Sequence, residues 1–560
     1  MMKAKKTVFT VLLCVLTSMS VWSQKKTPPA SAGGNQKGAA AKVKVTWGDA
    51  YEIPRKHSEA AFIGNAKEGY IQVLTHGNKS MILKRFDSKL KAAGLGTINL
   101  DDMPRGWVNE GFVTLKKNVY FLFSSWDHDA KRESFHARKV DLQGSSLGPI
   151  KDMMESDKIG VAGRGGFSFF GPMPAVRVGG YGTGKYTIMT SSDSSKLFVS
   201  YMLKPEVKND KKSFEIDGMY SFDEDLNKVN GGEFTMPYTE AMMDNEDYQV
   251  DKNGIIFMLA KVYEETRKEA KDKNTPNYHY EVFRYNKGNK NPDIIPFALQ
   301  DGFTKSIEIM DDADGNLRCT GFYSKERNGT TTGAFLLKLD AGQNTLSKFQ
   351  KGYYDFPADV LKQFETARTQ RKMERKEKKG TLGASNLEFR DFFIHPDGSV
   401  TLVGEEHYTV TTTTSDGHGH TTTHTTYYYN DIMAMNIDPV GNMAWVKKIP
   451  KAQSGGAGMG GMSFKFFAKG NDVYMFYLDN AKNATLTLDK TPAHHLDGKG
   501  GIFVCEKIDG KGKDSRTVLF DSKELKQRIY PTQITTVSTK QMLTTTARKK
   551  TRTLMMLTVD

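Results

Sequence analysis

The amino-acid sequence predicts an all-β protein, a β-propeller of eight four-stranded blades. Short apolar or alternating runs follow one another from Ala60 onward, and long helical periodicity is nearly absent. The same order of turns recurs from unit to unit. The last unit, 534–560, has only three strands, and an orphan strand at 43–54 supplies the fourth. A closure of this 3+1 kind seals a ring of sheets into a propeller.

The N-terminus predicts a secretory signal peptide over residues 1–24. A lysine-rich start precedes an apolar segment, 8–15, which is too short to span a bilayer. Residues 18–24 are small and polar enough for cleavage. No later segment is apolar enough to span a membrane. We therefore expect an exported protein, located in the periplasm, at the outer membrane or outside the cell.

The composition of the remaining chain excludes several alternatives. Residues 25–42 are rich in Ala, Gly, Lys and Pro and predict a disordered linker. The chain has 79 basic and 65 acidic residues, a net charge of +14, and cleavage after Gln24 lowers it to +11. A modest excess of positive charge spread over a long chain is more typical of solubility than of nucleic-acid binding.

Cys319 and Cys505 fall two units apart, so we expect two buried free thiols instead of a disulfide.

Tight turns containing Asp or Asn set the strand boundaries. The inner turns 251–254, 312–315 and 395–398 each end in Gly and precede a strongly apolar second strand. Gly supplies the positive φ of such turns, and Asp or Asn bonds back to the backbone. The third strands are predicted to end at Asp87, Asp141, Asp223, Asn286, Asp340, Asp438 and Asp509.

The fourth, outermost strands often end near a proline, which an unpaired sheet edge tolerates. Segment 445–450 begins with Trp445 and ends with Pro450, and segment 47–54 has the same pattern. This match assigns 43–54 as a fourth strand and defines one propeller domain over 43–560. The units are 60–105, 107–155, 184–238, 246–300, 302–356, 387–451, 462–521, and 530–560 with 43–54. Seven blades, or two stacked β-sandwich domains, are the alternatives.

With its signal peptide, repeated Asp-x-x-Gly inner turns and Trp or Phe…Pro outer strands, the chain resembles uncharacterised exported β-propeller proteins of Gram-negative bacteria. The resemblance covers nearly the whole mature chain and is architectural. The WD dipeptide and the paired glycines of Kelch repeats do not recur. The resemblance therefore implies a fold and export, and it implies no functional residues.

The predicted strand order places the long connections on one face of the ring. Turns 1–2 and 3–4 of each blade share one face, which we call the turn face, and they are short. Turns 2–3 and the blade-to-blade connections share the other, which we call the loop face. Its insertions are 156–185, 263–279, 351–386, 408–429 and 479–499, with shorter ones at 126–133, 204–213 and 451–462. Long loops on one face of a rigid scaffold usually carry recognition, whereas drift would lengthen loops on both faces.

Residues 408–429 predict a long two-stranded arm on the loop face. Thr and Tyr favour extended structure, and Asp416-Gly417 is a hairpin turn signal. The candidate binding residues here are His418, His420, His424, Tyr427 and Tyr428. The histidines could bind Zn²⁺, Cu²⁺ or Ni²⁺ with His407 or Asp416, but an exposed tip lacks the neighbours that orient metal ligands. Contact with a protein or glycan partner is the favoured hypothesis; the metal question stays open, and no cofactor is predicted.

Residues 357–379 predict one short inserted helix, which Pro357 begins and Gly380 ends. Val360, Leu361, Phe364 and Ala367 form a short apolar stripe that can dock on the ring. Residues 371–379 contain six basic and two acidic residues. Arg371, Lys372 and Arg375 are candidate contacts for anionic lipid or polysaccharide, although a solvated helix end has the same pattern. Interleaved aromatic residues are missing, so nucleic acid is not an expected partner.

No catalytic residues are predicted, because each sequence motif lacks its structural context. The P-loop spacing at 179–185 is followed by Tyr186 in place of the Ser or Thr that would hold Mg²⁺. The dinucleotide pattern at 456–461 lies outside any strand–helix unit. The nucleophile-elbow pattern at 144–148 lies in a short turn. The alternative function is a hydrolase or lyase acting on glycans or peptides at the central mouth. Its candidate residues are Glu110, Asp247, Glu308, Asp311 and Arg390, and a glycosidase pair among them would need carboxylates about 5–9.5 Å apart.

Overall fold

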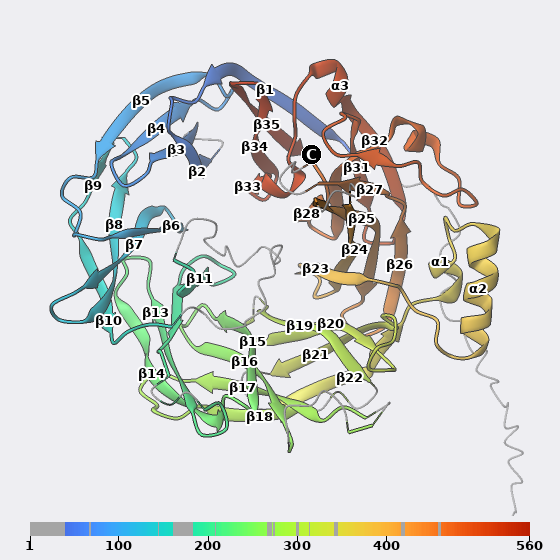
Figure 1. The fold of residues 1–560 in the computed structure, drawn as a ribbon, viewed down its shortest axis with the longest axis horizontal. Coiled ribbons are helices and arrows are strands. Elements are labelled where there is room, and N and C mark those ends of the chain that lie inside the picture. Colours follow the sequence, from blue (N-terminus) through green and yellow to red (C-terminus); the bar gives the residue numbers. More distant parts are fainter. Residues whose placement is uncertain are drawn as a thin grey trace, which may run out of the picture. The chain divides into compact units, whose positions relative to one another are not determined.

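Eight antiparallel sheets succeed one another along the chain, and Figure 1 shows them side by side around a ring. The structure is a computed structural model. It describes residues 40–560 except 66–68, 144, 161–182, 206, 208, 266–270, 273–274, 298, 300–301, 313, 341–344, 416–419 and 457–460. All described residues belong to one compact unit, Ala32–Asp560. The predicted signal peptide and residues 25–39 of the predicted linker lie outside the described residues.

Each blade consists of four strands that pair in chain order. Blade 1 contains β2 (Ser58–Asn65), β3 (Gly69–His76), β4 (Ser80–Phe86) and β5 (Ala92–Asn99). Blade 2 contains β6 (Val108–Leu115), β7 (Asn118–Asp127), β8 (Arg132–Asp141) and β10 (Lys151–Ser156), with the short β9 (Ser146–Leu147) also on β8. Blade 3 contains β11 (Tyr186–Thr190), β12 (Leu197–Met202), β13 (Phe214–Phe222) and β14 (Lys228–Thr239). Blade 4 contains β15 (Met243–Val250), β16 (Ile256–Tyr263), β17 (Tyr278–Tyr285) and β18 (Asp293–Phe297).

The second half of the ring follows the same plan with additions. Blade 5 contains β19 (Phe303–Asp311), β20 (Leu317–Ser324), β21 (Gly333–Asp340) and β22 (Thr345–Asp355). Blade 6 contains β23 (Leu387–Ile394), β24 (Val400–Ser415), β25 (Thr421–Ile437) and β26 (Met443–Ile449), and it is joined by β27 (Gln453–Gly455) and β30 (His495–Leu496). Blade 7 contains β28 (Phe464–Lys469), β29 (Asp472–Asp479), β31 (Ile502–Ile508) and β32 (Asp514–Asp521). The prediction of eight blades is therefore confirmed, and the seven-blade and sandwich alternatives are wrong.

Blade 8 is closed by the two ends of the propeller sequence. It contains β33 (Thr535–Thr536), β34 (Gln541–Arg548) and β35 (Thr551–Val559), and its fourth strand is β1 (Val43–Glu52). β1 pairs antiparallel with β35 from Val43 opposite Val559 to Glu52 opposite Thr551. Trp47 lies opposite Met555 and packs edge-on against Phe520 of blade 7. The 3+1 closure predicted from segment 43–54 is confirmed.

Apolar side chains of neighbouring blades interlock to form the core. Phe257 and Leu259 of β16, for example, share one cluster with Phe335 and Leu337 of β21 in the next blade. Because both sides of a second strand are covered by neighbouring sheets, β16 and β20 are buried along their whole length. This double coverage explains why the second strands are apolar runs and do not alternate. Cys319 and Cys505 are buried free thiols, as expected.

The predicted Asp turns form through carboxylate–backbone hydrogen bonds. Asp251 Oδ1 accepts from the backbone N–H of Asn253 at 2.9 Å and of Ile255 at 2.8 Å. Gly254 has φ +84°, which an L side chain rarely adopts. At the end of a third strand, Asp438 Oδ1 accepts in the same way from Val440 and Asn442. The same short-range contact therefore ends strands at both kinds of turn on the turn face.

The inserted segment after blade 5 differs from the prediction, because two helices replace the single one. They are α1 (Ala358–Leu361) and α2 (Ala367–Lys378), and they are separated at Phe364, which is buried with φ +60°. Ala367 is exposed and is not part of the docking stripe, whereas the partly buried Met373 of α2 packs on the same cluster as Val360 and Leu361. α2 ends as predicted, since Gly380 and Thr381 donate to the carbonyls of Glu377 and Lys376.

The other short helices lie in blade-to-blade or loop connections, and they are η1 (Ala481–Thr485), α3 (Ser522–Leu525) and η2 (Pro531–Gln533). The predicted long connection at 126–133 is shorter than expected, because β7 runs to Asp127 and β8 begins at Arg132. None of the described helices is both long and apolar enough to cross a membrane.

Candidate binding face

The long connections of the described chain lie between second and third strands or between blades, which places them on the loop face. The longest described ones are 356–386, 450–463, 480–501 and 522–534. On the turn face, β6–β7, β23–β24 and β28–β29 are joined by only a few residues each. The predicted insertion 156–185 falls mostly outside the described residues. The loop face therefore carries most of the irregular surface that can vary without changing the blades.

The arm predicted at 408–429 is the outer part of the hairpin β24–β25. The two strands pair from Tyr408 opposite Tyr428 to Ser415 opposite Thr421. Residues 409–415 and 421–424 are exposed, so these side chains contribute nothing to the core. His420 and His424 lie exposed on this outer part, with His424 opposite Thr412, whereas His418 lies outside the described residues.

The two sides of the arm differ in chemistry. Thr411 and Thr425 hydroxyls lie 3.1 Å apart across the strands, and those of Thr413 and Thr423 lie 3.2 Å apart. The opposite side carries Val410, Thr412, Thr414, Thr422, His424 and Thr426. Segments 408–415 and 421–429 contain no Asp, Glu, Lys or Arg. The arm thus offers rows of neutral hydroxyl groups and unpaired backbone edges to a partner.

Aromatic side chains surround the base of the arm. Tyr408 and Tyr428 stack at 4.7 Å with an interplanar angle of 8°, and the exposed His494 meets Tyr428 edge-on at 6.3 Å. β27 pairs with Tyr427–Tyr429 of β25, and β30 pairs in parallel with β27. Tyr427 and Tyr428 are therefore half-buried anchors at the base, and the arm is fixed to two connections of the loop face.

A buried ionic network lies beneath this base. Lys451 is fully buried, and its Nζ donates to Glu405 Oε1 at 2.7 Å, to the Tyr429 carbonyl at 2.8 Å and to Gln453 Oε1 at 3.1 Å. Burial lowers the pKa of Lys451, and the Glu405 carboxylate opposes that shift. Glu405 also accepts from Arg390 and from the Ser463 hydroxyl. Breaking such a pair leaves a buried charge without compensation, so the network holds the start of the 450–463 connection in place.

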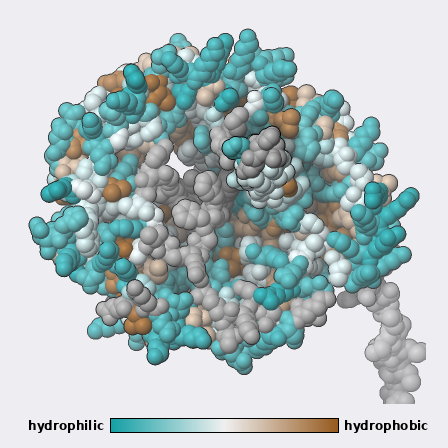
Figure 2. Space-filling model, in the orientation of Figure 1, coloured by the Kyte–Doolittle hydropathy of each residue, from teal (hydrophilic) through white to brown (hydrophobic). Residues whose placement is uncertain are grey.

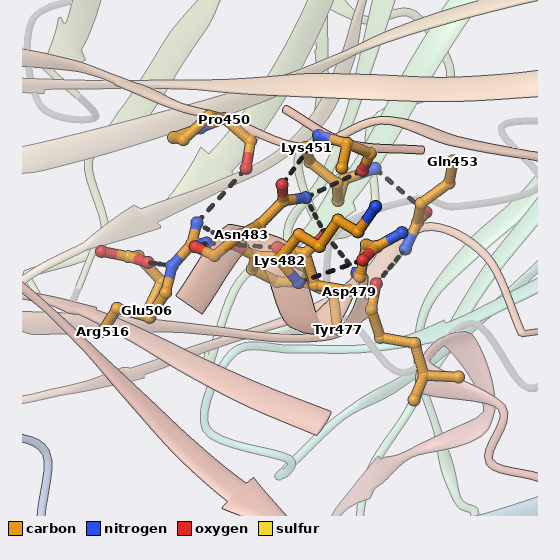
Figure 3. Close-up of polar contacts among 12 residues, drawn as sticks. Pro450, Lys451, Gln453, Tyr477, Asp479, Lys482, Asn483, Glu506 and Arg516 are labelled. Atoms are coloured by element: carbon orange, nitrogen blue, oxygen red, sulfur yellow. Dashed lines mark hydrogen bonds and ion pairs between the residues drawn. The ribbon is translucent and has the colours of Figure 1, made fainter. Parts of the chain in front are cut away.

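Arg516 joins the neighbouring connections in the same region (Figure 3). Its guanidinium donates to Glu506 Oε2 at 2.9 Å, to Asp479 Oδ2 at 3.1 Å and to the Pro450 carbonyl at 3.2 Å. Asp479 also accepts from Asn483, whose backbone carbonyl accepts from Arg516. The pKa of Asp479 is raised by burial, while the Arg516 charge acts in the opposite direction. These contacts fix segments 450–463 and 480–501 to blade 7.

A pocket of about 260 Å³ opens beside this network, where the connections 450–463, 480–501 and 522–534 meet. Its charged and polar lining residues are His495, Asp497, Lys499, Ser522, Lys523, Lys526, Gln527 and Arg528. His495 is 4% exposed, and burial, with the nearby Lys451 charge, lowers its pKa to about 4. The imidazole is therefore neutral near pH 7. The pKa of Asp497 is raised by burial, and its Oδ1 accepts from the Gly461 backbone N–H at 3.1 Å.

The basic residues Arg371, Lys372 and Arg375 lie exposed on α2. Figure 1 shows α2 at the outer edge of the ring, and Figure 2 shows a largely hydrophilic surface along that edge. α1 packs on blade 6 through Val360 and Leu361. The arm, in contrast, extends from the second and third strands of that blade. The sequence thus indicated two separate surfaces, and their role in binding stays a prediction.

The residues of the enzyme alternative lie on inner strands of four blades: Glu110 on β6, Asp247 on β15, Glu308 and Asp311 on β19, and Arg390 on β23. Glu110 accepts from Ser124 and Thr183, and Asp311 accepts from Ser192 and Gln249. Burial raises the pKa of Asp311 to about 6. Such satisfied buried carboxylates are typical of a polar core between blades, and this geometry assigns no acid–base pair.

Among the residues that the structure describes, no group of three or more His, Cys, Asp or Glu side chains could hold a metal ion. His418 lies outside those residues, so the metal hypothesis for the arm tip stays untested.

Sequence reasoning missed Glu405, Lys451 and the pocket. One signal was available: Gly498, Gly500 and Gly501 surround Lys499 in a loop, and basic residues recur at 523, 526 and 528. Glu110 and Arg390, which the sequence did indicate, are each the extra residue of a β-bulge on an inner strand. The inner strands of blades 1, 4 and 5 have a register shift at the matching place, so this bulge belongs to the repeat.

No protein-family model and no curated protein matches this chain. Solved structures resemble it at low identity. The β-propeller domain of the Trilobed protease from Pyrococcus furiosus is 10% identical, with a TM-score of 0.33, over 84% of this chain and 97% of that one. A protein of unknown function from Dyadobacter fermentans is 9% identical, with a TM-score of 0.29, over 67% and 94%. Polysaccharide lyase Uly1 is 10% identical, with a TM-score of 0.34, over 84% and 92%. Likenesses this weak transfer no site or activity.

Proposed function

We propose that the protein is an exported, non-catalytic binding or scaffold protein of the bacterial cell envelope. It presents its loop face to a protein or glycan partner. The observation that carries this proposal is the arm β24–β25, whose outer residues are exposed although its base is tied to β27 and to the buried Lys451–Glu405 pair. A rigidly held, exposed hairpin whose outer strand segments, 408–415 and 421–429, carry no Asp, Glu, Lys or Arg serves recognition better than packing.

Export is supported by the lysine-rich start and apolar segment of residues 1–24. A polar, uncharged partner is supported where it meets the strands of the arm. Segments 408–415 and 421–429 offer hydroxyl groups and backbone edges and contain no Asp, Glu, Lys or Arg. A glycan hydroxyl or an added peptide strand fits this surface.

The test replaces residues 410–426 by Asn-Gly. Thr409 and Tyr427 face each other, so a two-residue type I′ turn can close the shortened hairpin. We expect an unchanged thermal melting curve, because the removed residues that the structure describes, 410–415 and 420–426, are exposed or half-exposed. Affinity capture followed by mass spectrometry measures bound envelope proteins, and a glycan array measures bound glycans. In both assays we expect the shortened chain to lose partners that the full chain retains.

Two matched four-residue variants locate the contact on the arm. One changes Thr411, Thr413, Thr423 and Thr425 to Ala, and the other changes Thr412, Thr414, Thr422 and Thr426 to Ala on the opposite side. If one hydroxyl row makes the contact, only one variant loses capture; if the backbone edges make it, neither does. Capture that survives complete replacement of 410–426 would contradict the proposed role of the arm.

A further inference from the structure

The pocket beside blade 7 is built mainly from three connections of the loop face. Gly461 comes from 450–463, His495 to Gly500 come from 480–501, and Ser522 to Ile529 come from 522–534. Its volume of about 260 Å³ suits one small polar ring and is too small for a folded partner. The question is therefore which chemical group this lining recognises.

The charge of the lining is strongly one-sided. Lys499, Lys523, Lys526 and Arg528 line the pocket, and Asp497 is the one carboxylate beside them. Within the described part of the chain, none of these four cations forms an ion pair. The nearby Arg516, in contrast, is paired with Glu506 and Asp479. Arg528 is close enough to Asp497 for its charge to act on the pKa of that carboxylate. Four cations around one opening with a single carboxylate still raise the local concentration of anions and favour an anionic ligand.

The pocket also has neutral and acceptor groups that need partners. Within the described residues, Asp497 Oδ2 and His495 Nε2 are buried atoms without a hydrogen-bond partner. His495 is 4% exposed and neutral, and the Gln527 side chain adds a donor and an acceptor. Buried polar atoms are normally satisfied, so these atoms indicate a ligand that carries hydroxyl groups in addition to its charge.

The strand β30 links the pocket to the base of the arm. His494 precedes the pocket residue His495, and its ring meets Tyr428, which stacks on Tyr408. β30 connects this pocket through β27 to the base of the arm, with His495 opposite Gln453. His495 and Asp497 line the pocket and His494 does not, because successive side chains of a strand point to opposite sides. The aromatic pair therefore lies outside the pocket.

We propose that this pocket binds an acidic sugar, a sugar ring bearing a carboxylate or sulfate group. Lys499, Lys523, Lys526 and Arg528 hold the anionic group, and Asp497 and His495 bond to ring hydroxyls. This inference deepens the proposed function, on which it rests, by naming the ligand class of one site on the loop face.

Calorimetric titration of the mature full chain tests the proposal with three tetrasaccharide probes: a uronate, a sulfated sugar and a neutral sugar. We expect binding of at least one acidic probe, weakening as NaCl rises, and no measurable binding of the neutral one. Whether the uronate or the sulfated probe binds more tightly identifies the source of the anionic group.

A charge-matched pair of variants connects binding to the pocket. Lys523→Glu with Arg528→Glu is expected to weaken binding of the acidic probe about tenfold or more. Lys89→Glu with Lys511→Glu alters the net charge equally on exposed turn-face residues, and it should leave affinity nearly unchanged. Melting curves of both variants confirm folding, and Lys523→Gln with Arg528→Gln is the milder substitute if charge reversal unfolds the chain.

The proposal is overturned if no acidic probe binds, if the neutral probe binds equally well, or if the pocket and control variants lose affinity equally. Replacement of residues 410–426 separates this result from the proposed function. If the shortened chain still binds the acidic sugar but no longer captures partners, the result supports both the pocket proposal and the proposed function of the arm. Partner capture through the arm without any sugar binding overturns the pocket proposal and leaves the function of the arm standing.

Discussion

Glu406 lies where β24 leaves the ring, in a cluster with more acids than bases. Lys448 pairs with Glu365 at 2.9 Å and with Asp431 at 3.1 Å, so Glu406 faces two carboxylates and one shared cation. Burial, and then the Asp431 charge, raise the pKa of Glu406 from 4.5 to about 7. The folded protein therefore holds a proton on Glu406 in a pH range where the unfolded chain releases it.

This raised pKa predicts a pH-dependent stability. The contribution of Glu406 is complete below its usual pKa of 4.5 and is lost as pH rises through about 7. Glu406→Gln removes the titration and keeps the size of the side chain. We expect the variant to melt close to the wild type at pH 5. At pH 8 we expect it to melt about 2 °C higher, which corresponds to a gain of about 2 kcal/mol in the free energy of unfolding.

Scanning calorimetry at several pH values gives the comparison. Asp489→Asn is a suitable control, since Asp489 is an exposed carboxylate in the same group of loops. A constant difference between Glu406→Gln and wild type across this range would show that Glu406 does not titrate as proposed.

At the scale of elements, the Asp turns could be predicted from their local sequence, whereas the break between the two inserted helices could not. Each Asp turn depends on bonds between residues two and four apart, so its sequence is sufficient to identify it. The helix break depends on a distant residue. Lys448 of β26 donates to the Leu361 and Gln363 carbonyls and pairs with Glu365, which satisfies the end of α1 and permits the turn at Phe364.

The turn at the end of β25 provides an element-scale prediction. Asp438 accepts from Val440 at 3.1 Å and from Asn442 at 2.7 Å. Asp438→Ala should cost about 1 kcal/mol and speed amide exchange at Val440 and Asn442, because these N–H groups lose their acceptor. Hydrogen exchange read by NMR or mass spectrometry measures this directly.

Asp438→Asn is the control for this turn, because an amide oxygen can replace Oδ1. It should keep most of the protection. Equal exchange in the Ala variant and the wild type would mean that the strand pairing holds the turn without the carboxylate.

For the whole molecule, β1 determines whether the ring is closed. It covers one edge of β35, and its partly buried Val43, Val45 and Trp47 pack on the cluster that contains Met555 and Leu557. Without β1, β35 would have an unpaired edge beside exposed apolar side chains. Such an edge is a template for association between chains.

Removing residues 1–54 tests this closure. We expect a melting temperature lower by about 5 °C or more than that of a chain lacking only residues 1–39, together with concentration-dependent association seen by light scattering. The shorter truncation is the matched control, since it keeps β1 intact. Equal melting temperatures would mean that β1 contributes little to ring stability.

The sequence alone determined the blades, the closure and the arm. The Asp turns, apolar second strands and Trp…Pro outer strands are local patterns, and their order sets which connections share a face. The arm was predictable for the same reason, since Thr and Tyr strands around Asp416-Gly417 specify a hairpin within one short segment.

Only the tertiary structure decided the helix break, the buried Lys451–Glu405 pair and the pocket. Lys451 and Glu405 are 46 residues apart, and the pocket takes its lining from three connections between Gly461 and Ile529. No local pattern shows which distant side chains will meet, because that depends on how blades 6, 7 and 8 pack. The closure by β1 belongs to both levels: its strand pattern is local, and its pairing with β35 completes the ring that brings these connections together.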